Sequence, residues 1–200
     1  MNELDEIHDH NVNVKDRIIY LHQVDIEDSV SYKTIPNLIK NLDYLNSLGK
    51  SSIKIKMMGV DGGCVSQGLA AYASIKSSKC KVNIECYGFS ASSGTIILQA
   101  ASEGGRFISE YGDFCVHYGS ISLSSDLISA ESALASNKLW RNKMLEIYAK
   151  RAINGEFFKD RKYSISKVKA YLNRRFRDAG DWYLKDAEEV IYYGLADHVF

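Results

Sequence analysis

The serines best placed to do chemistry lie in one short stretch, residues 86–98, which reads Cys-Tyr-Gly-Phe-Ser-Ala-Ser-Ser-Gly-Thr-Ile-Ile-Leu. The alternating residues before it predict a strand that enters a tight turn at Gly88, and the small, apolar residues after it predict a buried helix. Amides at a helix N-terminus can stabilise the oxyanion that forms when a serine attacks a carbonyl. Ser90, Ser92 and Ser93 are therefore candidate nucleophiles, and capping of the helix by one of them is the alternative interpretation.

Two further motifs could supply the groups that such a nucleophile needs. Gly62 and Gly63 follow an alternating strand, and adjacent glycines let a backbone amide approach a ligand closely enough to face an oxyanion. His117 ends a short apolar run beside a loop, where an imidazole can serve as a general base. Taken singly, a glycine pair is typical of a plain turn, and a lone histidine is typical of a structural role.

Alternating strands and helices would position these motifs. In chain order we expect a helix at 34–48, a strand at 53–58, a helix at 65–77, a strand at 82–87, a helix at 94–101 and strands at 106–108 and 113–117. Thr34 is expected to cap the first of these helices, with Pro36 in its first turn. The alternation favours one α/β domain with a largely parallel sheet, for which 200 residues are sufficient.

Two more helices are expected in the second half of the chain. Residues 126–151 predict one long helix, and a basic helix begins at Ser164 or Ser166 and runs to about Phe176. The apolar face of the long helix consists of Ala130, Ala133, Trp140, Met144, Ile147 and Tyr148. That pattern leaves open whether the face packs in the core or against another subunit. The basic helix is best explained by a charged solvent face.

Composition argues against several classes of protein. Lys+Arg and Asp+Glu number 25 each, so the net charge is zero, which argues against a nucleic-acid binder. No polybasic cluster suggests a membrane surface. Residues 1–15 are polar, carry no signal peptide and are expected to be mobile, and no apolar run approaches a membrane span. The four cysteines form no Cys-x-x-Cys motif and indicate reduced, buried thiols of a cytoplasmic protein. No metal site is expected, since His8 and His10 are an isolated pair.

Together the three motifs resemble those of the proteolytic subunit of Clp protease (ClpP) and its wider family. That family has an Asn-Ser-Pro-Gly-Gly-Ser turn after a strand, then Gly-x-Ala-Ala-Ser-Met-Gly with the nucleophile, then Met-Ile-His with the base. The matching segments are 60–64, 88–94 and 115–117, and the gaps between them match without insertion. Residues 17–21 resemble the family's first strand, and 187–197 resemble its closing Ala-x-Glu-Ala-x-x-Tyr-Gly-Leu-Ile-Asp. The resemblance covers about residues 16–200 and is weakest between 118 and 180.

The resemblance implies a ClpP/crotonase-like α/β fold with a largely parallel sheet and a projecting handle helix. It divides the chain into a short N-terminal segment, 1–16, and a serine peptidase domain, 17–200, with the handle at about 118–165. Ser92 would be the nucleophile and His117 the base, and the backbone N–H groups of Gly63 and Ser93 would hold the oxyanion. No cofactor and no metal is implied for this chemistry.

An aspartate should complete the catalytic triad, and the resemblance favours Asp181. An ungapped count puts Trp182 at the position of the acid, and one inserted residue, assigned to Lys185, restores Asp181. Asp178 and Asp186 are the alternatives, although Asp186 also fits the N-cap of the helix that follows it.

The implied function is that of an ATP-dependent Clp-type serine endopeptidase that cuts peptide or unfolded-protein substrates inside a chamber. The family forms heptameric rings that stack into a tetradecamer and work with an AAA+ unfoldase. The departures from the family's motifs suggest a divergent, phage-encoded member, for which the unfoldase would be that of the host. Only residues 1–16 precede the first strand, so we expect the axial loop that meets the unfoldase to be short or missing. Asp61, Ser93 and Tyr118-Gly119 replace the family's Pro, Met and Gln-Pro, and we expect weaker catalysis or a changed substrate preference.

Three alternative functions stay open at this point. One is a catalytically weak or inactive subunit that only assembles, against which the intact Ser92 and His117 argue. Another is a specialised relative, such as a phage maturation peptidase. The third is a crotonase-type enzyme acting on acyl-CoA, which the serine–histidine pair fits less well.

Overall fold

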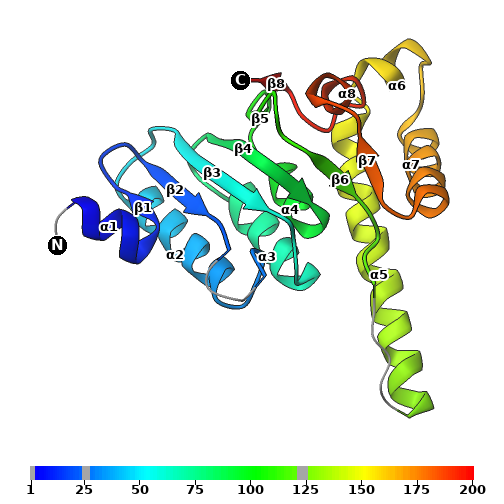
Figure 1. Ribbon diagram of the computed structural model, residues 1–200, viewed down its shortest axis with the longest axis horizontal. Helices are drawn as coiled ribbons and strands as arrows, with labels where there is room; N and C mark the ends of the chain where they lie inside the picture. The colour runs from blue at the N-terminus through cyan, green and yellow to red at the C-terminus, as the bar shows by residue number, and fades with distance from the viewer. Residues whose placement is uncertain (1–2, 24–27, 121–125) are drawn as a thin grey trace.

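The computed structural model describes residues 3–23, 28–120 and 126–200 of the chain (Figure 1). The strands are β1 (Val12–Asn13), β2 (Ile18–Leu21), β3 (Ile53–Val60), β4 (Val82–Ala91), β5 (Arg106–Ile108), β6 (Phe114–Val116), β7 (Trp182–Leu184) and β8 (His198–Val199). The helices are α1 (Glu3–His10), α2 (Thr34–Ser47), α3 (Val65–Lys76), α4 (Ser92–Leu98), α5 (Leu127–Ala152), α6 (Glu156–Asp160), α7 (Ile165–Ala179) and α8 (Ala187–Tyr192).

One sheet runs through the molecule in the order β1-β2-β3-β4-β5-β8, and β6 pairs with both β4 and β7. The β1–β2 and β6–β7 pairs are antiparallel, and the other pairs are parallel. Helices α2, α3 and α4 lie side by side on one face of the sheet (Figure 1). The predicted α/β class with a largely parallel sheet is therefore confirmed.

The core forms where the alternating strands meet the apolar helix faces. In β3 the side chains of Ile53, Ile55 and Met57 are buried while their neighbours face outward. In α2 the leucines three or four residues apart, among them Leu38 and Leu42, are buried against the sheet. No helix within the described ranges is long and apolar enough to cross a membrane.

Two glycines shape the ends of the central strands. Gly59 has a φ of 63°, and the β3–β4 register shifts between Met58 and Val60, which marks a β-bulge. Gly88 has a φ of 67°, but β4 does not turn there as predicted. The strand continues to Ala91 because its last residues pair with β6, a long-range partner that the local sequence does not reveal.

The N-terminal residues are ordered from residue 3 onward, so the prediction that residues 1–15 are mobile is wrong for most of that segment. Glu3–His10 form α1, and Val12 pairs with Ile19 across an antiparallel ladder. Asn41 Nδ2 of α2 also donates a hydrogen bond of 2.7 Å to the carbonyl oxygen of His10. The backbone pairing with β2 holds a segment whose polar composition suggested mobility.

The start of α2 also differs from the prediction. Thr34 is the first helical residue rather than the cap, and its hydroxyl donates to the carbonyl oxygen of Ser29 at 2.8 Å. The Ser31 hydroxyl instead accepts from the Thr34 N–H at 3.2 Å. A cluster of hydroxyls thus ties the start of α2 to the segment before it.

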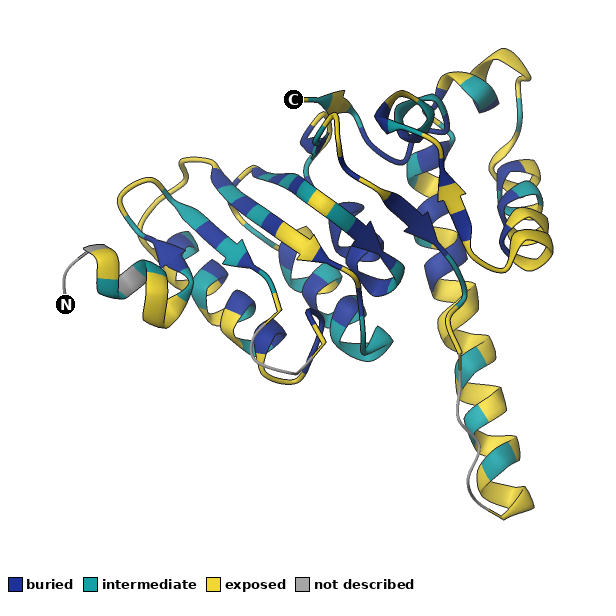
Figure 2. Ribbon diagram, viewed as in Figure 1, coloured by how far each residue is buried: buried dark blue, intermediate teal, exposed yellow. Residues whose placement is uncertain are grey.

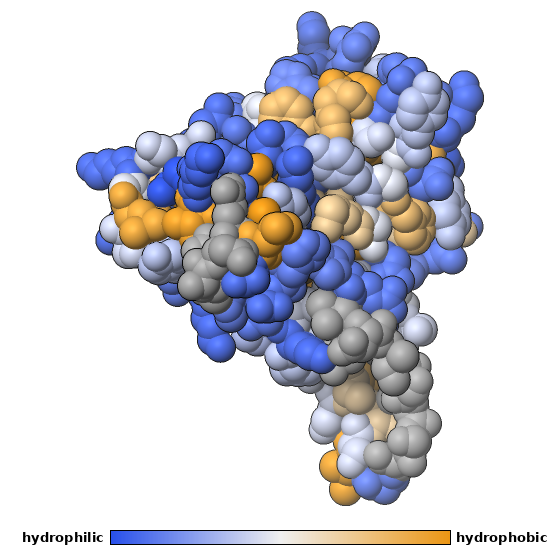
Figure 3. Space-filling model, turned by 60° about the vertical axis from the view of Figure 1, so that its left-hand side comes forward, coloured by the Kyte–Doolittle hydropathy of each residue, from blue (hydrophilic) through white to orange (hydrophobic). Residues whose placement is uncertain are grey.

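The long helix α5 has two dissimilar halves. Asp126 caps it by accepting a hydrogen bond of 3.1 Å from the Ser129 N–H, and its first half projects from the body of the molecule (Figure 2). Leu127 and Ile128 near its tip are 73% and 76% exposed, and apolar side chains gather there (Figure 3). Met144 is only 2% exposed, so for this residue the structure favours the first of the two alternatives that the pattern left open, packing in the chain's own core.

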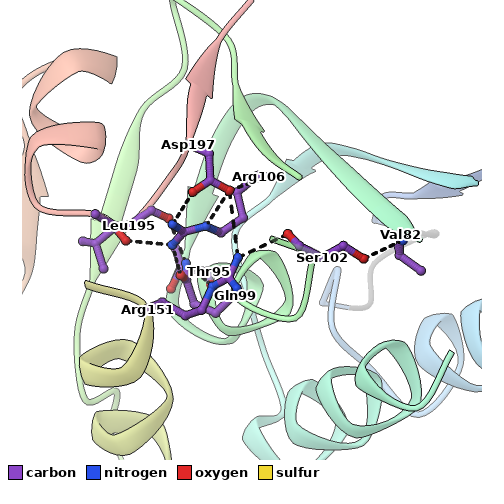
Figure 4. A network of polar contacts seen from close by, with 9 residues as sticks. Val82, Thr95, Gln99, Ser102, Arg106, Arg151, Leu195 and Asp197 are labelled. Carbon is purple, nitrogen blue, oxygen red and sulfur yellow. Dashed lines mark hydrogen bonds and ion pairs between the residues drawn. The ribbon is translucent and has the colours of Figure 1, made fainter. Parts of the chain in front are cut away.

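A buried polar network joins α4, β5, α5 and the C-terminal segment (Figure 4). Arg106, 3% exposed, donates from Nη2 to Asp197 Oδ1 at 2.5 Å and from Nη1 to Gln99 Oε1 and the Gly194 carbonyl oxygen at 2.7 Å each. Arg151 on α5 lies 3.9 Å from the same aspartate. The network fixes the segment that follows α4, the helix that begins at Ser92.

Candidate active site

Ser92 lies at the sharp junction between β4 and α4. Its φ of 52° is in the left-handed region, which non-glycine residues seldom occupy. Ala91 and Ser93 on either side are buried, whereas Ser92 is half-buried and reaches a cavity. A strained serine at a strand-to-helix turn with an accessible hydroxyl has the geometry of a nucleophile.

The other two candidate serines occupy different environments. Ser93 is buried and donates to the Gly63 carbonyl oxygen at 3.2 Å, and Ser90 is buried with no hydrogen-bond partner for Oγ among the described residues. Residue 91 holds the N-cap position of α4 and makes no side-chain cap. The alternative in which one of these serines caps the helix is therefore wrong.

Gly62 and Gly63 bring the β3–α3 loop against Ser92. Their φ values are 118° and 128°, and a Cβ on Gly62 would lie 2.7 Å from Ser92 Cβ. Val30 fixes the loop, since its N–H donates to Gly62 and its carbonyl oxygen accepts from Cys64, at 2.8 Å each. Within the described part of the chain, the Gly63 N–H donates no hydrogen bond, so it remains available to an oxyanion.

His117 and Asp181 meet across the antiparallel β6–β7 pair. Val116 lies opposite Trp182, and the next residues outward along the two strands are His117 and Asp181. His117 Nδ1 lies 2.6 Å from Asp181 Oδ1, and because an ionised carboxylate only accepts, Nδ1 carries the proton. The other ring nitrogen, Nε2, is then left to accept a proton from a nucleophile.

The two alternative aspartates have other partners. Asp178 Oδ1 lies 3.0 Å from Arg177 Nε, and Asp186 caps α8 by accepting from the Glu189 N–H at 2.8 Å. The cap role predicted for Asp186 is confirmed.

Two cavities flank His117. The first, here called the serine cavity, has a volume of about 460 Å³ and is lined by Ser92, Gly62, Gly63, Asp61 and Trp140, among others. The second, here called the arginine cavity, has a volume of about 550 Å³ and contains Asp181, Asn173, Arg141 and Arg177. Residues 117–120 line both cavities. Ser92 and His117 thus share a cavity, although no hydrogen bond joins them in the described chain.

Ser29 is a site residue that the sequence did not point to. It is fully buried, its Oγ lies 2.5 Å from Asp61 Oδ1, and it accepts a hydrogen bond of 3.1 Å from the Gly62 N–H. It stands 33 positions from Gly62, and a lone serine before a helix carries no signal of that contact. Asp28, which also lines the serine cavity, was overlooked for the same reason.

Two cysteines, Cys64 and Cys115, lie near these residues. Burial, together with the charge of Asp181, raises the pKa of Cys115 to about 11, so its thiol stays protonated. Burial also acts to raise the pKa of Cys64, but hydrogen bonds from Ser66 and nearby groups outweigh it and lower that pKa. Cys64 holds the N-cap position of α3 and lines the serine cavity together with Ser92. Among the described residues, no group of three or more His, Cys, Asp or Glu could hold a metal ion.

Comparisons with known proteins agree with the geometry. The model of the Clp protease family matches residues 6–200. The chain is 27% identical over 190 residues to the ATP-dependent Clp protease proteolytic subunit 2 of Chlamydia trachomatis serovar D, covering 93% of this chain and 81% of that protein. It is 26% identical over 188 residues to the ATP-dependent Clp protease proteolytic subunit of Streptococcus pyogenes serotype M5, covering 93% and 85%.

A comparison with solved structures shows that the fold is also that of a Clp protease subunit. A mutant ClpP1 from Listeria monocytogenes superposes with a TM-score of 0.72 at 18% identity, covering 94% of this chain and 92% of that one.

Proposed function

The chain belongs to the Clp protease family, and we propose that it is a serine peptidase in which Ser92 attacks, His117 transfers protons and Asp181 orients the imidazole. The observation that supports this most directly is the hydrogen bond between His117 Nδ1 and Asp181 at the border of the cavity that contains Ser92. A serine, a base and an orienting acid together make the acyl-transfer constellation.

The reaction follows from these positions. His117 Nε2 takes the proton of Ser92 as Oγ attacks the peptide carbonyl, and the N–H groups of Gly63 and Ser93 hold the resulting oxyanion. The intermediate collapses to an acyl-enzyme as His117 gives the proton to the leaving amine. Water, deprotonated by His117, then hydrolyses the ester and restores Ser92. No cofactor is needed for any of these steps.

Asp61 stands beside the oxyanion site, where its negative charge opposes the reaction. The Ser29 hydroxyl donates to this carboxylate, and the side chain is exposed to solvent, which screens its charge. We therefore expect slower catalysis rather than none.

We also propose that the peptidase works in the cytoplasm within a ring-shaped oligomer, in heptameric rings fed by an AAA+ unfoldase. The support is the family, whose relatives are named ATP-dependent proteolytic subunits, and the apolar projecting half of α5. Leu127, Ile128 and Leu139 are all more than half exposed there, which suits burial against another subunit. The chain itself has no phosphate-binding glycine motif, so ATP would act through the partner.

A serine-reactive fluorophosphonate tests the chemistry. It should label the wild-type protein at Ser92, and the label should vanish in Ser92→Ala. Ser90→Ala, which alters a buried neighbour outside the cavity, is the matched control and should keep the label. Labelling that is unchanged in Ser92→Ala would refute the assignment, and absence of label in a protein that still forms rings would favour the inactive assembly subunit.

Light scattering tests the assembly. The purified protein should form particles many times larger than one 22.5 kDa chain, and charged residues in place of Leu127 and Ile128 should reduce their size. A wild-type protein that is monomeric at micromolar concentration would contradict the ring proposal. It would leave the fluorophosphonate result to decide the chemistry separately.

A further inference from the structure

The charge of the site differs on the two sides of His117. The serine cavity is lined by the carboxylates of Asp28 and Asp61 and, among the described residues, by no lysine or arginine. The arginine cavity, on the other side, contains Arg141 and Arg177. A peptide that passes His117 therefore meets negative charge at one end and positive charge at the other.

Both arginines have partners among the described residues, whereas Asp28 and Asp61 have no basic side chain beside them there. Arg177 pairs with Asp178 at 3.0 Å, and the Arg141 guanidinium lies over the ring of Tyr118, 4.6 Å from its centroid. Within the described ranges, no lysine or arginine nitrogen lies within 4 Å of Asp28 or Asp61. The two carboxylates of the serine cavity are therefore available to pair with a cationic group of a substrate.

Asp61 is held in place rather than free to swing away. The 2.5 Å contact from Ser29 Oγ engages one carboxylate oxygen, and Ser29 is itself fully buried and bonded to Gly62. Because its position is fixed before a ligand arrives, Asp61 loses little conformational entropy when it binds a cation.

Asp28 lies directly over the glycine that is proposed to hold the oxyanion. A Cβ on Gly63 would come 2.5 Å from Asp28 Cβ and 3.0 Å from Asp28 Oδ2, so only glycine leaves room for this carboxylate. The two aspartates therefore lie beside two consecutive residues of the oxyanion loop.

The chemistry decides which substrate side chain they meet. The carbonyl oxygen of the scissile bond has to reach the Gly63 N–H, and the side chain nearest that carbonyl belongs to the residue on the acyl side. The leaving nitrogen faces His117, so the residue after the cut lies toward the arginine cavity.

Resting on the proposed function, we propose that Asp28 and Asp61 select substrates with a lysine or arginine on the acyl side of the scissile bond. The cation pairs with carboxylates that otherwise oppose the oxyanion, so it assists both binding and the transition state. Trp140, 36% exposed in the same cavity, offers an aromatic surface for the aliphatic stem or the charge.

Three peptide diphenyl phosphonates test the preference, because they phosphonylate the catalytic serine and differ only in the side chain beside phosphorus. The lysine-type probe should label Ser92 about tenfold faster than the leucine-type probe, as a charge-assisted hydrogen bond allows. The glutamate-type probe should be slowest. In Asp28→Asn combined with Asp61→Asn the lysine advantage should shrink toward unity, whereas Asp178→Asn, outside the serine cavity, should keep it.

The outcomes separate the two proposals. Equal rates for all three probes on wild-type protein would overturn the charge preference and leave the serine peptidase intact. A lysine advantage that survives the double substitution would also overturn it, because the aspartates would not be its source. No labelling by any phosphonate or fluorophosphonate would overturn the peptidase proposal and the preference with it. The wild-type comparison needs no variant, so it stands even if the double variant fails to fold.

Discussion

Two carboxylates in this protein accept hydrogen bonds of nearly equal length from basic side chains, in very different surroundings. Asp197 accepts from Arg106 at 2.5 Å, where the arginine side chain is 3% and the aspartate side chain 19% exposed. Asp181 accepts from His117 at 2.6 Å, where the two side chains are 28% and 59% exposed. The first pair lies within a network that connects four elements, whereas the second lies at the edge of two cavities.

The difference shows how similar pairings can serve structure or chemistry. A guanidinium group only donates hydrogen bonds, and three nitrogens of Arg106 already donate to protein oxygens. An imidazole, by contrast, can both accept and donate a proton, and among the described residues only Nδ1 of His117 has a hydrogen-bond partner. Removing one partner should therefore cost stability in the first pair and turnover in the second.

The largest effect is expected at the exposed pair. Asp181→Asn should lower peptide turnover about 10⁴-fold, because the imidazole loses the partner that fixes its tautomer. Thermal stability should barely change, since the side chain is 59% exposed. Peptide hydrolysis and thermal unfolding, measured on the same assembled sample, check both statements.

Asp178→Asn is the control for this prediction and should keep its activity. If Asp178→Asn or Asp186→Asn abolished hydrolysis while Asp181→Asn kept it, the assignment of the acid would be wrong.

A substitution in the buried pair, Arg106 and Asp197, should cost stability rather than turnover. Arg106→Leu should lower the free energy of unfolding by about 3–5 kcal/mol, because Asp197, Gln99 and the Gly194 carbonyl lose their partner in the interior. Urea unfolding at a fixed protein concentration measures it.

Arg177→Leu removes an exposed ion pair and should cost less than about 1 kcal/mol. Equal losses in the two arginine variants would mean that burial does not distinguish these pairs.

A smaller effect on stability is expected at Asp186, the N-cap of α8. Asp186→Ala removes the cap of α8 and should cost about 1 kcal/mol, while Asp186→Asn, which can still cap, should cost less. Both variants should keep the activity of the wild type. Loss of hydrolysis in Asp186→Ala without unfolding would give this residue a role in the reaction and weaken the comparison.

The smallest effect concerns pH. Burial acts to raise the pKa of Asp197, but hydrogen bonds from Arg106 and the charges of both arginines lower it below the ordinary value. A depressed pKa in the folded state means that the stabilisation is present above the unfolded-state pKa and is lost as pH falls through the folded-state pKa. Stability measured from pH 6 downward should fall less steeply in Arg106→Leu than in wild type, and identical slopes would contradict this origin.

Local sequence predicted much of the fold because the strands and helices follow clear periods. The alternation around Ile53 and the leucine spacing from Leu38 onward hold in the structure. The predictions that were wrong concern residues governed by distant partners. β4 runs past Gly88 because β6 pairs with it, and residues of the N-terminal segment are ordered because β1 pairs with β2.

At the site, too, the local motifs could be predicted, whereas the residues that depend on distant contacts could not. Motif order and spacing suggested that Ser92, Gly63 and His117 lie together, and they line one cavity, while their catalytic roles stay predictions. Ser29 and Asp28 could not be predicted, since their contacts with the glycine loop cross more than thirty positions and depend on a turn with positive φ. The choice of Asp181 among the aspartates rested on where a gap was placed in the comparison with the family. The β6–β7 register brings Asp181 beside His117, and its role as the orienting acid stays a prediction.

Helix α5 is held at one end only, since its second half packs in the body of the molecule and its first half projects from it. The buried side chains of Met144 and Tyr148 anchor the helix in the core, and the Tyr148 hydroxyl lies 2.5 Å from Thr95 Oγ1 of α4. At 1.5 Å per residue, Leu127 lies about 25 Å beyond Met144, whereas Trp140 lies only about 6 Å beyond it. The displacement of a rod held at one end grows steeply with distance from the held end. The tip of α5 can therefore move to meet another subunit while Trp140, which lines the serine cavity, stays in place. A force on the tip would move Trp140 only by rotating the whole helix about its anchored residues.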